Sequence, residues 1–461
     1  MQNLIASLRG AIVLLIADVI GLIGFFNLAH YLRTLFMDGE TPPDPLSLIW
    51  VAAVFLFTMY VFDIYRGLLR ESTAKLVIRT ASAVIVAACI MAILVYIIKP
   101  DQTNPLYWRG VLPVGTAMFL VWATVCRVIF ATWMQSRLRA YTWLVLGYGQ
   151  LAKCLWRDVR RARDIGKFSF LEVDCEDMPS RPVDMPKPEG TVSTLPLLLD
   201  RSWTGVILAT EDPPSEPAIS ALMRARLRGA RIYDLTDFYE RFFFKLPVLN
   251  LRDGWLIFAH GFDLLHRNVE LRIKRVIDVF LSLSLLVALS PLMLIAAFAV
   301  KFDSKGPILF RQLRTGLKGE VFTLHKFRTM IEDAEQSGAQ WAAKNDPRVT
   351  RIGRLLRATR IDELPQLWNV LIGEMSFIGP RPERPDFNRE LEEAIPYYDL
   401  RHLVKPGITG WAQVLYPYGA SIEDAREKLQ YDLYYIKNYS AMLDLVILIR
   451  TFRVVLVGRG R

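Results

Sequence analysis

The sequence predicts a membrane protein of mixed α and α/β class, in which membrane-spanning helices precede a doubly wound α/β domain and a mainly helical domain. Hydrophobic residues make up 52% of the 461 residues and charged residues 22%, and the mean hydropathy is +0.26. This composition is too apolar for an ordinary soluble enzyme and too charged for a chain made only of spanning helices. It excludes a disordered chain, a collagen and a small disulfide scaffold. We expect the three parts at residues 1–140, 141–265 and 266–461.

Four apolar runs predict a four-helix transmembrane region, because about 20 apolar residues span a hydrocarbon core. Asp18 is the only charge that they contain. It could serve as a proton or substrate site, but we favour a charge that faces the interior of the helix bundle and is paired there. The four runs are 11–29, 46–62, 80–98 and 110–126.

The basic residues between these runs predict their orientation. The loop at 63–79 carries four basic residues and the stretch after residue 126 is densely basic. The loops at 31–45 and 99–109 carry one and two. We therefore expect a multi-pass protein whose N-terminus, and everything after about residue 130, face the cytoplasm.

A fifth apolar run at 280–300 is long enough to span a membrane, but two features favour a re-entrant hairpin at 276–302. Ser290 and Pro291 lie in its middle, and proline lacks an N–H and clashes with the carbonyl four residues earlier. The flanks on both sides are basic. A helix that enters, breaks at Pro291 and returns to the same face fits both facts. A kinked full span is the alternative.

The segment after residue 141 alternates predicted strands and helices. A buried strand at 142–147 leads into Gly147, Gly149 and Ala152, which form G-x-G-x-x-A at a strand-to-helix turn, as in a Rossmann-like fold. Further strands are expected at 168–173, 204–209 and 230–233, with a helix at 218–228. Five prolines between 177 and 196 predict a loop, and no Y-x-x-x-K pair occurs. We favour a structural or regulatory domain without a bound cofactor over a nucleotide-binding one.

The charged segment after residue 301 holds the candidate chemistry. Asp362 and Glu363 precede Pro365, which can open a helix, and carboxylates are stabilised near a helix N-terminus. Their oxygen atoms suit Mg²⁺, which usually takes one or two carboxylates together with substrate phosphates. Ordinary charges at a helix N-terminus are the alternative interpretation of this pair. The four cysteines form no CxxC pair, so a zinc site or a disulfide framework is not expected.

Cationic residues flank the acidic pair. Arginines recur every third residue from Arg348 to Arg360, and Lys326, Arg328 and Arg381 add further positive charge. Because the guanidinium fork matches phosphate oxygens, these residues together predict a pyrophosphate site at a membrane surface. The net charge of +10 is compatible with nucleic acid or with anionic lipids and phosphorylated substrates. The apolar composition favours the second, and nucleic acid is not an expected partner.

Several motifs follow one another in order after residue 270. They are Lys274-Arg275-Val-Ile-Asp278, the run with Ser290-Pro291, KFRTM at 326–330, DPRVTRIGRLLRATRIDELPQLWNVL at 346–371, GEMSFIGPRPE at 373–383 and KPGITGWAQV at 405–414. Through them residues 270–461 resemble the bacterial sugar transferases, the polyprenyl-phosphate glycosyl-1-phosphate transferases. With the preceding spans and α/β segment, the chain is similar to the long, polytopic branch of exopolysaccharide type. Its members initiate exopolysaccharide, capsule or O-antigen synthesis.

The resemblance implies transfer of hexose-1-phosphate from a UDP-sugar, with UDP-glucose expected, to undecaprenyl phosphate, with release of UMP. It makes Asp362 the nucleophile that forms a phosphosugar-aspartyl intermediate, and Glu363 a residue that assists the metal or the lipid phosphate. Mg²⁺ would neutralise the pyrophosphate, and Arg357 and Arg381 would bind phosphate. The expected location is the bacterial inner membrane, where membrane lipids are partners and a homodimer is allowed.

The chain departs from many relatives after GWAQV, where an Asn-Gly-Arg turn is replaced. Here Ser421 and Asp424 predict a helix cap instead, so neither the arginine of that turn nor its sugar preference is transferred. The C-terminal run at 442–457 predicts an interfacial helix. Two other functions stay open: a membrane-bound NAD-dependent NDP-sugar dehydratase or epimerase, and a non-catalytic scaffold for polysaccharide assembly.

Overall fold

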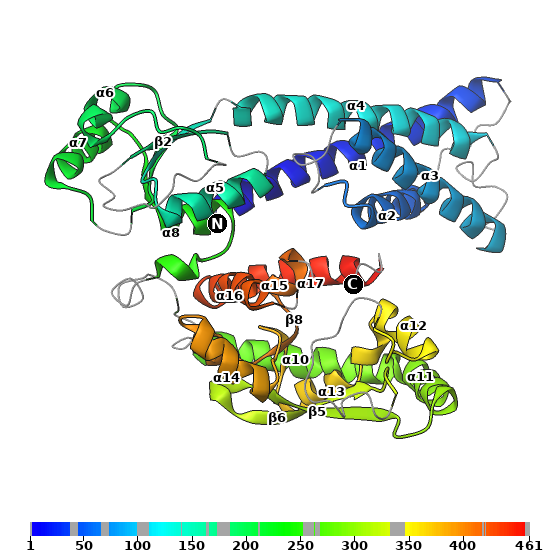
Figure 1. Cartoon of the computed structure of the whole chain (residues 1–461). Helices are drawn as coiled ribbons and strands as arrows, with labels where there is room; N and C mark the ends of the chain where they lie inside the picture. The colour runs from blue at the N-terminus through cyan, green and yellow to red at the C-terminus, as the bar shows by residue number, and fades with distance from the viewer. Residues whose placement is uncertain are drawn as a thin grey trace. The chain divides into compact units, whose positions relative to one another are not determined.

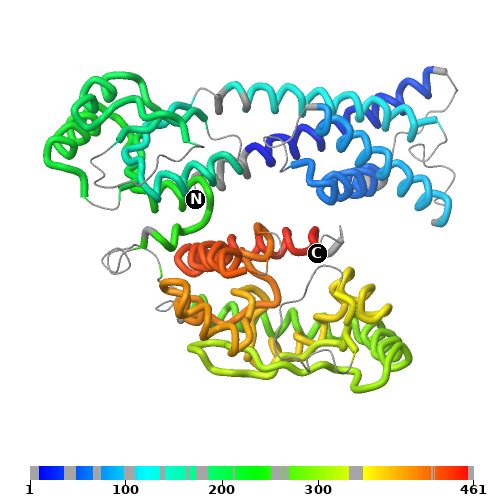
Figure 2. The backbone as a smooth tube through the Cα atoms, viewed as in Figure 1, coloured from blue at the N-terminus to red at the C-terminus, as the bar shows by residue number. Residues whose placement is uncertain are grey.

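The computed structural model describes residues 2–36, 45–65, 73–98, 110–139, 141–162, 166–172, 185–210, 213–251, 262, 268–331, 346–416, 419 and 421–456 (Figure 2). The chain divides into two compact units, Met1–Leu235 and Thr236–Arg461. The sequence-based boundaries near residues 140 and 265 stay predictions.

Four helices begin the first unit: α1 (Gln2–Phe36), α2 (Pro45–Val61), α3 (Thr73–Ile98) and α4 (Val111–Arg139). Three of them contain stretches that are long and apolar enough to cross a membrane: Gly10–Leu35, Ala74–Ile97 and Val111–Met134. The second predicted span is helical, but its apolar part, Leu48–Val61, is shorter than these. The described residues of this unit therefore confirm three membrane-capable helices where four spans were predicted.

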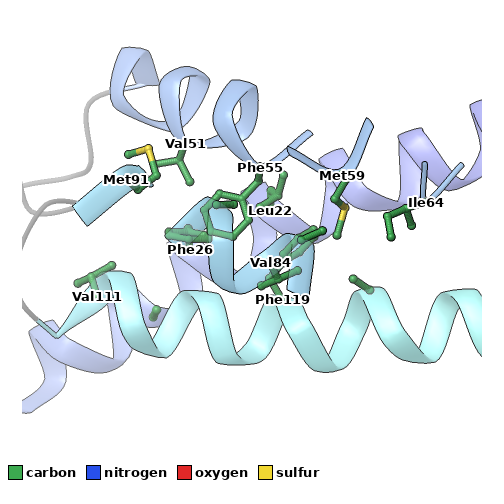
Figure 3. Close-up of a cluster of buried hydrophobic side chains, with 14 residues drawn as sticks. Leu22, Phe26, Val51, Phe55, Met59, Ile64, Val84, Met91, Val111 and Phe119 are labelled. Atoms are coloured by element: carbon green, nitrogen blue, oxygen red, sulfur yellow. The ribbon is translucent and has the colours of Figure 1, made fainter. Parts of the chain in front are cut away.

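All four helices contribute to one apolar core (Figure 3). Leu22, Phe26, Phe55, Val84 and Phe119 are fully or almost fully buried there. The ring of Phe55 lies edge-on to Phe26 and to Phe119, with centroids 5.8 and 5.7 Å apart, a geometry that aromatic quadrupoles favour. Many outward-facing side chains of α1, α3 and α4 are apolar as well. A helix that is hydrophobic on all sides is typical of a membrane environment.

A parallel sheet follows in the same unit, with helices around it (Figure 1). Its strand order is β2-β1-β3-β4, and every neighbouring pair is parallel. Each strand overlaps a stretch where the sequence predicts one. The strands are β1 (Thr142–Leu146), β2 (Lys167–Leu171), β3 (Gly205–Leu208) and β4 (Ile232–Asp234), and the helices are α5 (Gln150–Ala162), η3 (Val192–Thr194), α6 (Leu195–Leu199) and α7 (Glu216–Leu227).

The first glycine of the G-x-G-x-x-A motif has a structural reason to be glycine. Gly147 has a φ of +122°, and a Cβ atom there would lie 2.3 Å from the carbonyl oxygen of Ala209 at the end of β3. The motif therefore lets the chain turn from β1 into α5 while it passes close to the end of β3. Residues 177–184 of the predicted proline-rich loop lie outside the described residues, and η3 lies within the remainder of it, 185–196.

Two helices of the second unit, α10 (Asn268–Ala288) and α11 (Ser290–Asp303), meet at a bend of 62° (Figure 1). Pro291 has no N–H for the carbonyl of Val287, four residues earlier. The hydroxyl of Ser290 donates a hydrogen bond of 2.8 Å to that carbonyl oxygen. The bend thus lies where the sequence predicts a break. A bent helix pair of this kind occurs in broken spans and in re-entrant hairpins, so the re-entrant path stays a prediction.

The remaining elements of this unit are short helices with two small sheets. An antiparallel hairpin joins β5 (Leu309–Thr315) to β6 (Val321–Phe327), and β7 (Ser376–Ile378) is parallel to β8 (Gly407–Thr409). Ser421 caps α16 through a capping box with Asp424, which confirms the predicted helix start. The helices are α8 (Leu235–Phe242), η4 (Val248–Asn250), η6 (Leu317–Gly319), α12 (Arg351–Thr359), η7 (Ile361–Glu363), α13 (Gln366–Ile372), α14 (Pro385–Ala394), η8 (Tyr398–Leu403), α15 (Trp411–Leu415), α16 (Ile422–Lys437) and α17 (Ala441–Leu456).

Candidate active site

Asp362 and Glu363 lie in η7, a single turn between α12 and α13. Arg360 ends α12 in the left-handed conformation, with a φ of +59°, which reverses the chain sharply before the acidic pair. Pro365 then precedes the first residue of α13, as predicted. Both acidic residues are buried, with 7% and 9% of their surface exposed. The turn therefore places two adjacent carboxyl groups inside the protein.

Three cations surround the carboxylate of Glu363. Its Oε1 lies 2.8 Å from Nη2 of Arg381, 3.3 Å from Nη1 of Arg360 and 3.6 Å from Nζ of Lys326. Burial alone would raise the pKa of Glu363, but these positive charges hold that pKa well below its usual range. Glu363 is therefore ionised and held in place.

Asp362 experiences a different balance of charges. Burial, followed by the negative charge of Glu363, raises its pKa, and Lys326, Arg360 and Arg357 oppose that rise. Its buried Oδ1 atom has no hydrogen-bond partner among the residues that the structure describes. Paired carboxyl groups whose pKa values are pushed apart are typical of catalytic sites. Here one carboxylate is fixed by cations, and the other keeps an oxygen atom for a ligand or a reaction.

Lys326 and Arg357 approach the pair from two different elements. Lys326 lies on β6, where burial lowers its pKa to about 8 although Glu363 opposes the change. Arg357 lies on α12, and its Nε donates a hydrogen bond of 2.7 Å to the hydroxyl of Thr329. Gly353 makes this contact reachable, because a Cβ atom there would lie 2.1 Å from the carbonyl oxygen of Thr329.

The helix that follows the acidic pair is fixed to β6 by one buried amide. Asn369 is fully buried, and its Nδ2 donates to the carbonyl oxygen of Thr323 at 2.7 Å. Its Oδ1 accepts from the backbone N–H of His325 at 3.2 Å. The side chain therefore bonds to β6 as a neighbouring strand would, and it fixes α13 against the strand that carries Lys326.

Charged residues of α10 hold two other elements of the site. The guanidinium of Arg275 donates to the carbonyl oxygens of Val370 and Leu371, near the C-terminal end of α13. The carboxylate of Asp278 accepts a hydrogen bond of 3.0 Å from the backbone N–H of Phe377 in β7. The segment with the membrane-type bend is thereby bonded directly to α13 and β7, the two elements that follow the acidic pair in the chain.

The structure separates the predicted site residues into two groups. It brings Lys326 and Arg381 to the acidic pair, with Arg357 close enough to influence the charge of Asp362. Arg328 lies elsewhere: its Nη2 donates to the backbone and hydroxyl oxygens of Ser304, at 2.6 and 3.0 Å, next to the end of α11. Its Nε and Nη1 atoms are buried and have no hydrogen-bond partner among the described residues, so its phosphate-binding role stays a prediction. Ser290 and Pro291 lie at the helix bend.

The sequence pattern does not single out Arg360, Asn369 or the contacts made by Arg275 and Asp278. Arg360 was one member of a regular arginine run, and its left-handed backbone conformation was the property that distinguishes it. Asn369, Arg275 and Asp278 belong to the motifs that carry the family resemblance, but a motif does not show which atoms a side chain will contact.

A magnesium site can be tested against the donor atoms present. The described residues contain no group of three or more His, Cys, Asp or Glu that could hold a metal ion. The unbonded Oδ1 of Asp362 is one suitable oxygen donor, whereas Oε1 of Glu363 is already shared among cations. Mg²⁺ commonly keeps only one or two protein carboxylates and takes substrate phosphates and water for the rest. The residues therefore fit a metal that binds with the substrate, through Asp362.

Comparisons with known proteins place the second unit in a family. The family model described as "Bacterial sugar transferase" matches residues 269–458. The "Exopolysaccharide production protein PSS" of Rhizobium leguminosarum bv. phaseoli is 43% identical over 189 residues, which are 40% of this chain and 94% of that protein. This chain belongs to the bacterial sugar transferase family. The resemblance seen in the sequence motifs is confirmed.

Two longer relatives of this sugar transferase are named for their reactions. The "UDP-N-acetylgalactosamine-undecaprenyl-phosphate N-acetylgalactosaminephosphotransferase" of Aeromonas hydrophila is 42% identical over 239 residues, 52% of this chain and 55% of that protein. The "UDP-glucose:undecaprenyl-phosphate glucose-1-phosphate transferase" of Xanthomonas campestris pv. campestris is 44% identical over 210 residues, 45% of this chain and 42% of that protein. The chain thus spans about half the length of these two relatives.

Proposed function

We propose that this sugar transferase moves a sugar-1-phosphate from a UDP-sugar to undecaprenyl phosphate and releases UMP. The observation that carries the proposal is the buried acidic pair, in which three cations hold Glu363 while Asp362 keeps an unbonded oxygen. Relatives named for glucose and for N-acetylgalactosamine transfer support the reaction class. We propose UDP-glucose as the preferred donor.

In the first step a carboxylate oxygen of Asp362 attacks the β-phosphorus of the UDP-sugar. A bond forms between that oxygen and phosphorus, and the bond from phosphorus to the bridging oxygen breaks. UMP leaves with the bonding electrons, and the sugar phosphate stays on Asp362 as an acyl phosphate. Lys326, Arg381 and Arg360 are close enough to offset the negative charge that gathers at the phosphoryl group.

In the second step a phosphate oxygen of undecaprenyl phosphate attacks the same phosphorus atom. The bond to Asp362 breaks, the carboxylate is regenerated, and a lipid diphosphate sugar is released. The ionised Glu363 never needs to leave its cations, so it fixes Arg381 and Lys326 throughout. Asp362 must enter the cycle as a carboxylate; burial and the charge of Glu363 raise its pKa, and the positive charges of Lys326, Arg360 and Arg357 limit that rise.

We propose Mg²⁺ as the cofactor of both steps. When bound at Asp362 and the phosphate oxygens, it would supply further neutralisation of the diphosphate charge. Glu363 would support this arrangement through the cations that it holds.

The proposed setting is the bacterial inner membrane, with the second unit on the cytoplasmic side, where UDP-sugars are made. Within it the enzyme would initiate exopolysaccharide, capsule or O-antigen synthesis. Membrane lipids and a second copy of the chain are further proposed partners. The strand order β2-β1-β3-β4 supports a Rossmann-like assignment for the α/β segment, because doubly wound folds reverse their strand order beside the first strand.

The proposal is tested by incubating the membrane-purified protein with undecaprenyl phosphate, Mg²⁺ and a panel of UDP-sugars. UDP-glucose, UDP-N-acetylglucosamine and UDP-N-acetylgalactosamine are compared, and the nucleotide product is identified. We expect catalytic amounts of UMP only when donor and acceptor are both present, with the highest rate for UDP-glucose. Release of UDP would indicate a direct glycosyl transfer instead. No nucleotide release with any donor would contradict the proposal and favour a scaffold.

A further inference from the structure

The segment that carries Arg381 has an unusual set of backbone hydrogen bonds. Pro380 and Pro382 contribute no N–H group, so the segment cannot pair as an ordinary strand on that side. Its four successive carbonyl oxygens accept bonds from β8, η8 and β5, at 2.9 to 3.0 Å. The donors are the N–H of Gly407 for Pro380, Nη2 of Arg401 for Arg381, Nη1 of Arg314 for Pro382 and the N–H of Thr315 for Glu383.

Arg401 is the donor to Arg381 itself, and it is buried. Its Nη2 lies 2.9 Å from the carbonyl oxygen of Arg381 and 3.0 Å from Oδ2 of Asp432 on α16. Its Nη1 donates to the hydroxyl of Tyr398. Arg401, Asp432 and Tyr398 are 6%, 2% and 1% exposed. A buried ion pair therefore donates a hydrogen bond to the backbone of Arg381, and the side chain of Arg381 contacts Glu363.

Stability alone is a weak reason to keep such a pair in this place. Desolvation of two charges offsets most of their attraction, and apolar replacements of buried pairs are often neutral or stabilising. The geometry gives a second reason, because one guanidinium nitrogen bonds to both the carboxylate and the carbonyl. A planar guanidinium can hold three acceptors in fixed directions, which a lysine ammonium on a flexible stem does less well.

We infer that Arg401, held by Asp432, is a positioning residue that fixes the backbone of Arg381 so that the Arg381 side chain reaches Glu363. The kinetic effects that this inference predicts rest on the proposed function. Its structural effects rest on geometry alone. Two contacts link Asp432 to the Arg381 backbone, and a third, of 2.8 Å, links the Arg381 side chain to Glu363. Loss of the contacts made by Arg401 leaves every group at the acidic pair chemically intact but less well placed.

Two variants of the full chain test this inference: Arg401→Lys, and Asp432→Asn in case the first does not fold. The matched control is Glu240→Gln, which weakens another ion pair of α16, the partly buried one between Lys437 and Glu240 at 2.6 Å. We expect Arg401→Lys and Asp432→Asn to lower kcat by about tenfold while KM for the UDP-sugar changes by less than about threefold. The control should keep kcat within about twofold at a similar thermal midpoint.

A double-mutant cycle separates positioning from a general loss of structure. Arg401→Lys is combined with Arg381→Lys and, separately, with Arg357→Lys, which approaches the pair from α12. If Arg401 acts through Arg381, its substitution should reduce kcat by less than about twofold in the Arg381→Lys background. It should keep its full effect in the Arg357→Lys background. If Arg401→Lys lowers kcat by the same factor in both backgrounds, the inference is wrong.

Hydrogen–deuterium exchange gives a readout that does not depend on activity. The N–H groups of Thr315 and Gly407 bond to the same segment, so Arg401→Lys should speed their exchange by about tenfold or more. The N–H of His325, bonded to Asn369, should be unchanged. Unchanged exchange at Thr315 and Gly407 would contradict the positioning role of Arg401. If the unmodified protein releases no UMP, the proposed function fails, and the exchange result still decides the inference.

Discussion

Asp18 of α1 and Arg127 of α4, which lie 109 positions apart in the sequence, form a fully buried ion pair between these two helices. The two Nη atoms of Arg127 lie 2.9 and 2.6 Å from the two carboxylate oxygens of Asp18. The hydroxyl of Tyr65, just beyond α2, donates to the same carboxylate at 2.7 Å. The prediction that Asp18 faces the interior is confirmed, and the single charge of the first apolar run has a partner.

Removing one member of this pair should destabilise the first unit more than removing both. Arg127→Met leaves a buried carboxylate without its cation, which costs about 3–5 kcal/mol in such settings. The double variant Asp18→Leu with Arg127→Met should recover most of that loss. Thermal unfolding in detergent measures both, and Asn27→Leu on the exposed side of α1 is the control. A double variant less stable than Arg127→Met would refute the pairing as the source of the loss.

Arg360 should show opposite effects on stability and activity when it is replaced by glycine. Its left-handed backbone costs roughly 1–2 kcal/mol for a residue with a Cβ atom, while its side chain contacts Glu363 at 3.3 Å. Arg360→Gly and Arg360→Ala remove the same guanidinium, but only glycine relieves the backbone. We expect similar losses of activity, of about three- to tenfold, and a higher thermal midpoint for the glycine variant. Full activity in either variant would contradict a role for the side chain.

The α10–α11 pair should enter and leave the membrane on the cytoplasmic side. Single cysteines at Lys274 and Lys305 in a variant without the four native cysteines flank the bent pair. Both should resist a membrane-impermeant thiol reagent in intact cells and react in inverted vesicles. Labelling at position 305 from outside the cell would instead show a true crossing. Pro291→Ala, which restores the missing N–H, should lose activity by shifting Asp362 relative to the lipid phosphate.

Chelation of divalent cations should stop UMP release. The unbonded Oδ1 of Asp362 is the protein donor proposed for the metal, so activity should return with Mg²⁺ and partly with Mn²⁺, which accepts similar oxygen ligands. Ca²⁺, which prefers more ligands at longer distances, is the control. Undiminished turnover in excess EDTA would remove the metal from the mechanism.

Hydropathy and local signals predicted much of this structure. Apolar runs placed α1, α3 and α4, because lipid and core both select apolar residues over a fixed length. Proline chemistry placed the bend at Ser290 and Pro291, and Ser421 marked the start of α16, because these effects act within a few residues of the chain. α2 was predicted as a full span, and its apolar helix is shorter than the others.

Long-range polar contacts could not be predicted in the same way. Asn369 bonds to β6 from 44 and 46 positions away, and Arg401 reaches the carbonyl of Arg381 across 20. Nothing in the neighbouring sequence marks such residues, since an exposed polar residue has the same local pattern. Arg328 is a further case, because it belongs to a charged motif and is predicted at the phosphate site, whereas its Nη2 donates to Ser304 next to the end of α11. Its role in phosphate binding stays a prediction.

The proposed reaction depends on covalent attachment of the sugar phosphate to Asp362. The most direct measurement is intact-protein mass spectrometry after incubation with UDP-glucose and Mg²⁺ but without undecaprenyl phosphate, followed by mapping of the modified peptide. We predict an added hexose phosphate on Asp362, with up to one equivalent of UMP released, and neither product from Asp362→Asn. Sustained UMP release by Asp362→Asn at the unmodified rate, once undecaprenyl phosphate is added, would show that Asp362 is not the nucleophile.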